Sequence, residues 1–374
     1  MTDLVRTVAR PPLKPRRLIW VVNHRTLMPA EVPILRSIGW EVFVPKIVPE
    51  HDPDYPSAVT TYEHDATLTL PMSALQVLNR HDFYKHTWSP TVEDIIDRHF
   101  DAIISTFSIY TTPLSEAARK FGGQIIARVF GREHPRTYAE LAAASRHKYL
   151  LPELGAVGNR FVFGQAYGNL SDIEPAELRS RAHTIPVPLP AEIYNHQNTW
   201  CGDGSAAVFT CPWIRPGFHY GNIYDGIKKN FGDLPHLIFG RQYAPLDDPA
   251  VLPYLTDIEL LNLYVATPVF VYPHTEPRHV HYSPLEAMVV GTPTLYLRGA
   301  LIDALTGGAD LPGACETIAE MHTKAQRLLN GDRILADAIR ATQGQVLETF
   351  SPDLARRQWE AVLADGPLFA SRGA

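Results

Sequence analysis

The fold is decided by the stretch Val269-Phe-Val-Tyr-Pro-His-Thr-Glu276-Pro-Arg-His-Val-His-Tyr-Ser-Pro-Leu-Glu286-Ala-Met-Val-Val-Gly291-Thr-Pro293. It predicts a buried strand, a polar loop, a helix that opens on Glu286, and a Gly-Thr-Pro turn before a second apolar run. A strand, a helix and another strand in this order form a βαβ unit. In open α/β sheets, ligands bind beyond the carboxyl ends of the strands. The carboxylates and histidines between Pro273 and Glu286 are therefore candidates for a functional site.

The same alternation of strands and helices extends through both halves of the chain. Short apolar runs rich in β-branched residues predict strands, and the runs with helical spacing between them predict helices. The predicted strands are residues 18–22, 40–44, 101–107, 124–130, 161–163, 206–210 and 237–239. The predicted helices are residues 31–38, 114–121, 222–231, 257–266, 318–330 and 333–347. Alternation of this kind predicts an α/β fold with doubly wound parallel sheets.

The length of 374 residues exceeds what one ordinary core fills, so two domains are expected. Residues 191–204 predict the linker between them, because Pro186, Pro188 and Pro190 lead into a polar run that contains glycine. This division gives a first domain over 18–190 and a second domain over 205–351. Ser351 and Pro352 then predict the N-cap and first turn of a last helix in the segment 352–374.

The composition describes a soluble globular protein, with 45% hydrophobic and 20% charged residues. The net charge of −6 argues against general nucleic-acid binding, which needs a basic footprint. Three cysteines without metal-ligand spacing indicate a reducing compartment and no disulfide framework. No run of 18 apolar residues is present to span a membrane, and the first apolar run has the length of a strand rather than of a signal peptide. A cytoplasmic location is expected.

The segment 1–17 is predicted to form a basic N-terminal arm, because its five Lys or Arg residues face a single acid, Asp3. One interpretation is a solvated arm without fixed structure. The other is weak attraction to an anionic inner-membrane surface, which is worth about 1 kcal/mol for each basic residue near the lipid. Peripheral contact with the inner membrane surface is therefore among the expected interactions.

The run from Glu276 to Pro293 resembles the nucleotide-sugar site of GT-B glycosyltransferases. It is similar to the retaining group whose motif has two glutamates separated by seven residues, followed by Ala-Met and Gly-Thr-Pro. Here nine residues separate Glu276 from Glu286, and Arg278-His279 stands in place of the usual Phe-Gly. The resemblance implies two Rossmann-like domains that face each other across a cleft, the first for the acceptor and the second for the nucleotide sugar. It also implies that the last helix crosses back onto the first domain.

The resemblance implies roles for polar residues of the second domain. Glu286 matches the glutamate that accepts hydrogen bonds from the ribose hydroxyls, and Glu276 would contact the donor sugar. Arg215 matches an arginine that holds the diphosphate, whereas Tyr220 stands at the position of the usual lysine. Further candidates for binding the nucleotide sugar are Arg278, His279, Ser283, Arg241 and Lys229. The plainer alternatives are a loop acid, a capping serine and lysines on a solvated helix face.

In the first domain, Glu133 and His134 follow the predicted strand 124–130. The resemblance implies a histidine near the reacting sugar at this strand end, so His134 is a catalytic candidate together with Glu276. Glu133 would act as the general base if the enzyme inverts the anomeric centre. The alternative for this loop is a capping role. Contacts to the acceptor are expected from the residues after the first strand, Asn23, His24 and Arg25.

These features predict a glycosyltransferase that moves a sugar from a nucleotide-diphosphate donor to a sugar or lipid-linked acceptor. No metal and no cofactor are expected, because Arg side chains and helix N-termini can neutralise the leaving diphosphate. A metal site made from His274, His279 and His281 is possible on composition, but His-x-His alone is a weak signal. Two alternatives stay open: a non-catalytic GT-B-like partner protein, and another GT-B enzyme such as a nucleotide-sugar epimerase.

Overall fold

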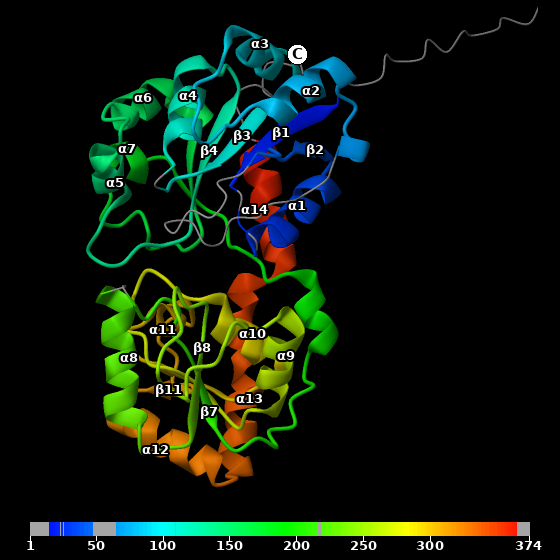
Figure 1. Cartoon of the computed structure of the whole chain (residues 1–374). Coiled ribbons are helices and arrows are strands. Elements are labelled where there is room, and N and C mark those ends of the chain that lie inside the picture. The colour runs from blue at the N-terminus through cyan, green and yellow to red at the C-terminus, as the bar shows by residue number, and fades with distance from the viewer. Residues whose placement is uncertain are drawn as a thin grey trace, which may run out of the picture.

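The computed structural model describes residues 15–22, 24, 26–47, 65–108, 110–215 and 218–364. Within these residues the chain forms two α/β domains, each built on one parallel sheet (Figure 1). The first sheet has six strands in the order β2-β1-β3-β4-β5-β6, and the second has five in the order β11-β10-β9-β7-β8. This architecture confirms the predicted pair of doubly wound, Rossmann-like sheets.

The first domain alternates strands with helices. Its strands are β1 (Arg16–Val21), β2 (Trp40–Phe43), β3 (Ala102–Thr106), β4 (Gln124–Val129), β5 (Phe161–Gln165) and β6 (Ala182–Thr184). Its helices are α1 (Leu27–Ser37), α2 (Met72–Arg80), α3 (Pro90–His99), α4 (Thr112–Lys120), α5 (Tyr138–Ala144), α6 (Leu150–Val157) and α7 (Ala176–Arg179). A short 3-10 helix, η3 (Ala191–His196), opens the connection to the second domain.

The second domain repeats the alternation with shorter strands. They are β7 (Ala207–Thr210), β8 (His236–Phe239), β9 (Phe270–Tyr272), β10 (Thr294–Leu297) and β11 (Ala314–Cys315). The helices are α8 (Phe218–Phe231), α9 (Asp257–Ala266), α10 (Tyr282–Val290), α11 (Leu301–Leu305), α12 (Ile318–Leu329), α13 (Arg333–Leu347) and α14 (Pro352–Ala364). None of the described helices is long and apolar enough to cross a bilayer.

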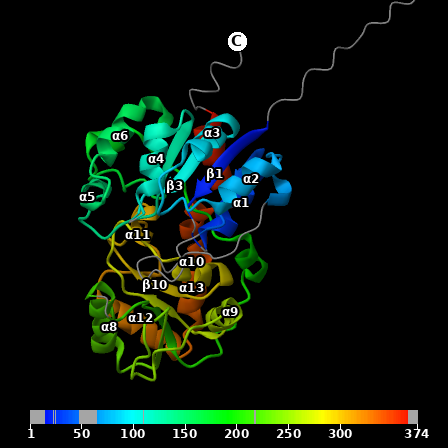
Figure 2. The same cartoon turned by 45° about the horizontal axis from the view of Figure 1, so that its top comes forward.

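Helices cover both faces of the first sheet (Figure 2). The connection from β1 to β2 runs in the opposite direction along the sheet from the connections β3 to β4 and β4 to β5. Because such crossovers are right-handed, α1 lies on one face while α4 and α6 lie together on the other. The central strands are therefore buried on both sides, which explains why they read as continuous apolar runs.

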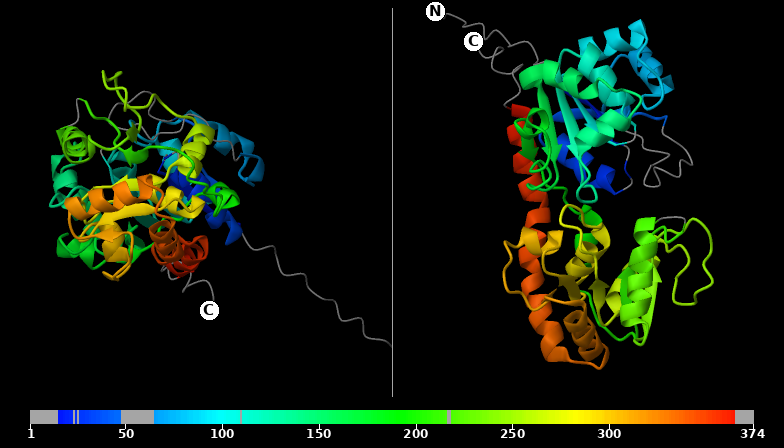
Figure 3. Two further views of the ribbon diagram at one scale, coloured as in Figure 1. Left: turned by 90° about the horizontal axis from the view of Figure 1, so that it is seen from below. Right: turned by 90° about the vertical axis from the view of Figure 1, so that its left-hand side faces the viewer.

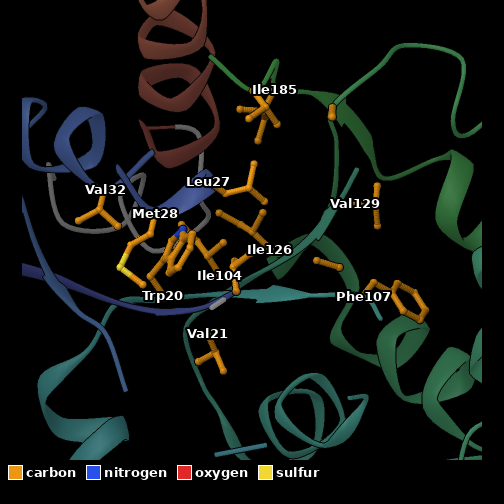
Figure 4. Packing of buried hydrophobic residues seen from close by; sticks show 14 of the residues in the cluster. Trp20, Val21, Leu27, Met28, Val32, Ile104, Phe107, Ile126, Val129 and Ile185 are labelled. Carbon is orange, nitrogen blue, oxygen red and sulfur yellow. The ribbon is translucent and has the colours of Figure 1, made fainter. Parts of the chain in front are cut away.

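The core of the first domain is built around β1. Trp20 and Val21 are neighbours in this strand and point to opposite faces of the sheet (Figure 4). Trp20 lies with Leu27 and Met28 of α1 and with Ile104 of β3, and all four side chains are at most 2% exposed. The first helix is thus held by the apolar face that it presents to the sheet.

A fully buried ion pair lies between this helix and the sheet. Arg128 Nε in β4 donates to Glu31 Oε1 in α1 at 2.7 Å, and Trp20 Nε1 donates to Glu31 Oε2 at 3.3 Å. Neither side chain of the pair is exposed. The Arg128 guanidinium also lies 5.5 Å from the ring centroid of Trp359 in α14. One charge therefore connects a strand, the first helix and the last helix.

The last helix lies on the first domain, although it follows the second domain along the chain. In the right panel of Figure 3, α13 and α14 run along one side of both domains. Gln124 Nε2 donates to the Val362 carbonyl oxygen at 2.9 Å, and Trp359 is fully buried. Residues 365–374 of the expected C-terminal segment lie outside the described residues.

Two predicted boundaries are wrong. Helix α10 begins at Tyr282, with His281 at its N-cap, so Glu286 lies inside the helix and Ser283 lies in its first turn. Pro284 is compatible with this early start because the first turn of a helix needs no intrahelical N–H donor. The basic arm was expected to reach residue 17, but Arg17 belongs to β1 and its Nε lies 2.6 Å from Glu41 Oε2. Residues 1–14 lie outside the described residues.

Replacing Glu31 with Leu is expected to destabilise the first domain by about 3–5 kcal/mol, because it leaves the buried Arg128 charge without its carboxylate. The double variant Glu31→Leu/Arg128→Met should recover most of this loss. Urea unfolding followed by tryptophan fluorescence measures both effects. A double variant as unstable as the single one would show that lost packing, rather than the unpaired charge, causes the destabilisation.

Candidate functional site

A loop of the second domain, residues 273–281 between β9 and α10, enters the first domain. Its Arg278 side chain is only 3% exposed. Arg278 Nη1 donates to the Arg136 carbonyl oxygen at 2.8 Å, and Nη2 donates to the Leu170 carbonyl oxygen at 2.7 Å. Arg278 was expected to supply positive charge to a phosphate. In this arrangement its guanidinium faces the first domain instead.

Glu174 of the first domain is the acidic partner of this arginine. Its buried Oε1 lies 3.6 Å from Arg278 Nη2. The same carboxylate accepts the backbone N–H groups of Tyr138 at 2.8 Å and Ala139 at 3.1 Å, at the start of α5. A carboxylate at this helix end also benefits from the positive end of the helix dipole. Glu174 therefore joins the inserted arginine to the segment that follows β4.

Glu276 connects the same two segments from the other side. Its Oε2 accepts the backbone N–H of His134 at 2.9 Å, and its Oε1 accepts the backbone N–H of Arg278 at 3.0 Å. Gly131, with φ of +111°, lies so close to the inserted loop that a Cβ there would collide with the Arg278 carbonyl oxygen. The structure thus brings Glu276 and His134 together through the His134 backbone, while the His134 side chain is exposed.

Histidines and tyrosines gather where β7 and β9 end. His281 Nδ1 lies 2.9 Å from the Tyr272 hydroxyl, and His281 Nε2 lies 3.2 Å from the Tyr220 hydroxyl of α8. His274 stacks on Tyr272 with ring centroids 4.3 Å apart, and His279 lies edge-on to His281 at 5.0 Å. In the part of the chain that the structure describes, no three His, Cys, Asp or Glu side chains are grouped to hold a metal ion.

The histidine cluster faces Glu133 of the first domain. Burial, and to a smaller extent the negative charge of Glu133, raise the pKa of Tyr220 to about 12. This electrostatic effect requires Glu133 to lie near the Tyr220 hydroxyl. Glu133, His134, Glu276 and the cluster therefore occupy one region between the domains, beyond the carboxyl ends of the strands of both sheets.

Glu286 lies at a second part of the same interdomain region. Tyr264 of α9 donates its hydroxyl to Glu286 Oε2 at 3.2 Å. Burial, and to a smaller extent the charge of Asp257, raise the Glu286 pKa to about 7, although the hydrogen bond from Tyr264 lowers it. The carboxylate lines a cavity of about 410 Å³ between α1, η3 and α9. A half-buried carboxylate with a perturbed pKa in a cavity is typical of a ligand site.

Of the remaining candidates of the second domain, two lie at the carboxyl edge of the sheet and one lies far from it. Arg215 and Arg241 are exposed in the loops after β7 and β8, and the Trp213 N–H donates to the Arg241 carbonyl oxygen at 3.0 Å. Those two loops are therefore adjacent at the carboxyl edge of the sheet. Lys229 lies in the last turn of α8, about 16 Å along the helix from that edge at 1.5 Å per residue. The structure does not bring Lys229 to the site.

His24 has a local partner in the first domain. Its Nδ1 accepts the backbone N–H groups of Thr26 at 3.2 Å and Leu27 at 3.3 Å, at the start of α1. Burial lowers the His24 pKa to about 4, which keeps the ring neutral and able to accept these bonds. The ring was expected to contact the acceptor, and here it satisfies helix N–H groups. The neighbouring candidates Asn23 and Arg25 lie outside the described residues.

Sequence reasoning missed Glu174, Tyr264 and Tyr272. Glu174 and Tyr264 act on Arg278 and Glu286, which lie far from them in the sequence. Tyr272 pairs with His281 nine residues later, a separation that matches no helical or strand spacing. A partial signal existed for Tyr264, since residues 257, 260, 261 and 264 of α9 recur at the spacing of one helix face and all line the cavity. Nothing comparable marks Glu174, which pairs with Arg278 across the two domains.

No protein-family model and no curated protein matches this sequence. Solved structures do resemble the fold. A glycosyltransferase from Rickettsia africae has a TM-score of 0.59 at 10% identity, covering 94% of this chain and 99% of its own. The N-terminal domain of Candida albicans trehalose-6-phosphate phosphatase has a TM-score of 0.58 at 10% identity, with coverages of 95% and 98%.

Sucrose-phosphate synthase from Thermosynechococcus elongatus has a TM-score of 0.55 at 14% identity, covering 95% of this chain and all of its own. These likenesses extend over both domains, so they apply to the two-domain arrangement and not to one sheet alone. They confirm the GT-B fold that the sequence predicted. At 10–14% identity the likeness shows the fold alone.

Replacing Arg278 with Lys is expected to loosen the contact between the inserted loop and α5. The ammonium group of Lys lacks the planar, forked donors with which the guanidinium contacts two carbonyl groups and a carboxylate at once. Hydrogen exchange at the amides of His134, Tyr138 and Ala139 should accelerate about tenfold, equivalent to ~1.4 kcal/mol. Arg298→Lys, an ion-paired surface position of the second domain, is the control. Unchanged exchange in Arg278→Lys would contradict the role given to the guanidinium.

Replacing Glu286 with Gln is expected to raise the melting temperature at pH 8 and to change it little at pH 5. The pKa of Glu286 is raised from 4.5 to about 7, so the folded protein binds more protons than the unfolded chain between these values. Stability of the native protein therefore falls as pH rises through this range, and Gln removes that fall. Differential scanning fluorimetry at pH 5 and pH 8 measures the melting temperatures, and the exposed Glu177→Gln is the control. Equal shifts at pH 5 and pH 8 would contradict the assigned pKa.

Proposed function

We propose that this protein is a glycosyltransferase, which moves a sugar from a nucleotide-diphosphate donor to a sugar or lipid-linked acceptor without a metal ion. The observation that carries the proposal is the Glu286 carboxylate, which lies on α10 and lines a cavity between the two domains. Ribose hydroxyls can donate hydrogen bonds to this carboxylate. The GT-B fold supports the proposal as a scaffold on which such transferases are built, although fold alone does not specify chemistry.

The proposed donor extends from the cavity toward the histidine cluster. With its nucleoside beside Glu286, the diphosphate reaches the first turn of α10, where Ser283 and the backbone N–H groups lie. The N-terminus of a helix favours phosphate because of its unpaired N–H groups and its dipole. Arg215, in the loop after the neighbouring strand β7, adds positive charge on the same side. The donor sugar then lies toward Glu276, Glu133 and His134.

The proposed chemistry needs stabilisation of the charge that develops on the leaving diphosphate. Preorganised N–H groups and guanidinium groups act strongly in a cleft from which water is excluded. Glu133 is the proposed general base if the transfer inverts the anomeric centre. Glu276 accepts two backbone N–H groups, and its proposed role is therefore to hold the loop that carries His134 close to the donor sugar.

The proposal predicts that nucleotide binding depends on Glu286. A thermal-shift screen with UDP, GDP, CMP and TDP should identify at least one ligand, since a ligand at 100 times its Kd stabilises by about 2.7 kcal/mol. Glu286→Ala should weaken that ligand at least tenfold, because charge-assisted hydrogen bonds contribute roughly 1.5–3 kcal/mol each. Calorimetry in EDTA measures the affinity and also tests whether binding is independent of metal.

Glu177→Gln serves as the control, since Glu177 is exposed on the first domain. A nucleotide that binds equally well to the native protein and to Glu286→Ala would show that Glu286 does not bind the nucleotide. Binding that EDTA abolishes and Mn²⁺ restores would overturn metal independence. His274, His279 and His281 would then be the candidate metal ligands. Donor turnover should accompany binding, because binding without turnover is the behaviour of a non-catalytic partner protein.

A further inference from the structure

A buried tyrosine contacts the carboxylate on which the proposed function depends. The Tyr264 side chain is 1% exposed, and its hydroxyl donates to Glu286 Oε2 at 3.2 Å. A buried phenol hydroxyl needs a hydrogen-bond partner, whereas the ring of Phe would fill the same space without needing one. Both residues line the cavity. Tyr264 therefore joins α9 to α10 at the point where the cavity presents its carboxylate.

The packing around Tyr264 fixes the position of its ring. Phe239 of β8 and Phe270 of β9 lie with their ring centroids 6.0 Å and 6.1 Å from that of Tyr264. The Tyr264 carbonyl oxygen accepts the Thr292 hydroxyl at 2.7 Å, in the Gly-Thr-Pro turn that follows α10. Contacts on both the ring and the backbone hold the hydroxyl in place. A donor that is locked by packing can in turn hold the side chain that it contacts in one orientation.

Tyr264 is the donor of this hydrogen bond throughout the neutral pH range. Burial, and to a smaller extent the charge of Glu286, raise the pKa of Tyr264 well above its usual value, although a hydrogen bond with Ser283 lowers it. Tyr264 therefore keeps its proton, and the Glu286 carboxylate accepts it in a hydrogen bond. A carboxylate has about four lone-pair sites, so Glu286 can accept ribose hydroxyls as well.

The surroundings of Glu286 disfavour its ionised form, and Tyr264 opposes them. Burial, and to a smaller extent the charge of Asp257, raise the pKa of Glu286 to about 7, whereas the hydrogen bond from Tyr264 lowers it. A hydrogen bond donated to the charged form of a group favours that form. Further titratable groups of the described residues that line the cavity or act electrostatically beside Glu286 are Glu192 and His196 of η3 and Tyr282 of α10.

We propose that Tyr264 is a positioning residue for donor binding, because its hydroxyl holds the Glu286 carboxylate in the orientation in which it accepts the ribose hydroxyls of the nucleotide sugar. This inference rests on the proposed function and adds a residue that acts through Glu286 rather than on the donor itself. Removing the hydroxyl has two consequences. The carboxylate loses its fixed orientation, and it stays protonated up to a higher pH. A tyrosine that only packs has no such effect on the pH at which the ligand binds.

The test measures the binding of UDP, GDP, CMP and TDP by calorimetry from pH 6 to pH 9, on the native protein and on Tyr264→Phe. In the native protein the affinity should rise with pH as Glu286, with its pKa of about 7, becomes ionised. Tyr264→Phe moves this rise to higher pH. The dissociation constant of the variant should therefore exceed the native one about tenfold at pH 6 and 7, and this ratio should fall toward pH 9.

The ratio isolates the hydrogen bond from Tyr264. Native protein and variant share Asp257, Glu192 and His196, and the same nucleotide is compared at the same pH, so the other titrations cancel. In the background of Glu286→Gln, which cannot ionise, adding Tyr264→Phe should give a ratio that does not change with pH. Tyr149→Phe, a tyrosine of the first domain that is 74% exposed, is the matched control and should leave the ratio at one. Melting temperatures show that each variant is folded at each pH.

A ratio near one at every pH overturns the role of Tyr264. So does a raised ratio that is the same from pH 6 to pH 9, because that is the behaviour of a residue that only packs. In both cases, binding that still depends on Glu286 leaves the proposed function standing. If none of the four nucleotides binds to the native protein, the proposed function fails and the role of Tyr264 fails with it.

Discussion

The insertion of Arg278 into the first domain is the contact on which the rest of the structure depends. A buried guanidinium is costly unless acceptors surround it, and here two carbonyl oxygens and the Glu174 carboxylate do so. Glu174 also holds the first amides of α5. One carboxylate therefore fixes the loop that carries Glu276 against the segment that carries Glu133 and His134. The relative position of the domains and the shape of the candidate site follow from the same interaction.

The electrostatic surroundings of Glu286 differ from those of Glu174. Glu174 has a cation and two N–H groups around it, whereas the hydrogen bond that Glu286 receives comes from the Tyr264 hydroxyl. Burial and the nearby Asp257 then raise its pKa to about 7, so ionising it inside the protein is unfavourable. A ligand that donates hydrogen bonds to the ionised form would relieve this cost. The two glutamates thus differ in their surroundings: Glu174 is paired within the fold, whereas the ionised form of Glu286 is disfavoured.

The strands and most long helices could be predicted because their signals are local. Helix α9 spans the predicted residues 257–266, and α13 spans the predicted residues 333–347. Helix α3 was missed, although Ser89 caps it and Pro90 starts it, and α5 was missed despite a Thr137–Glu140 capping box. Those signals were readable. The start of α10 had no such local signal. There the hydroxyl of Tyr272, a residue of the preceding strand, accepts the His281 N–H.

By itself, the sequence determined that two parallel sheets form and that Glu276, His279 and Glu286 follow the same strand, because hydrophobic periodicity and turn residues act over a few positions. Only the tertiary structure decided that Arg278 turns into the first domain and that Lys229 lies far from the site. It also joined Glu286, Tyr264 and Asp257 around one cavity. The physical reason is that burial and charge pairing act between residues that the chain brings together only after both sheets have formed.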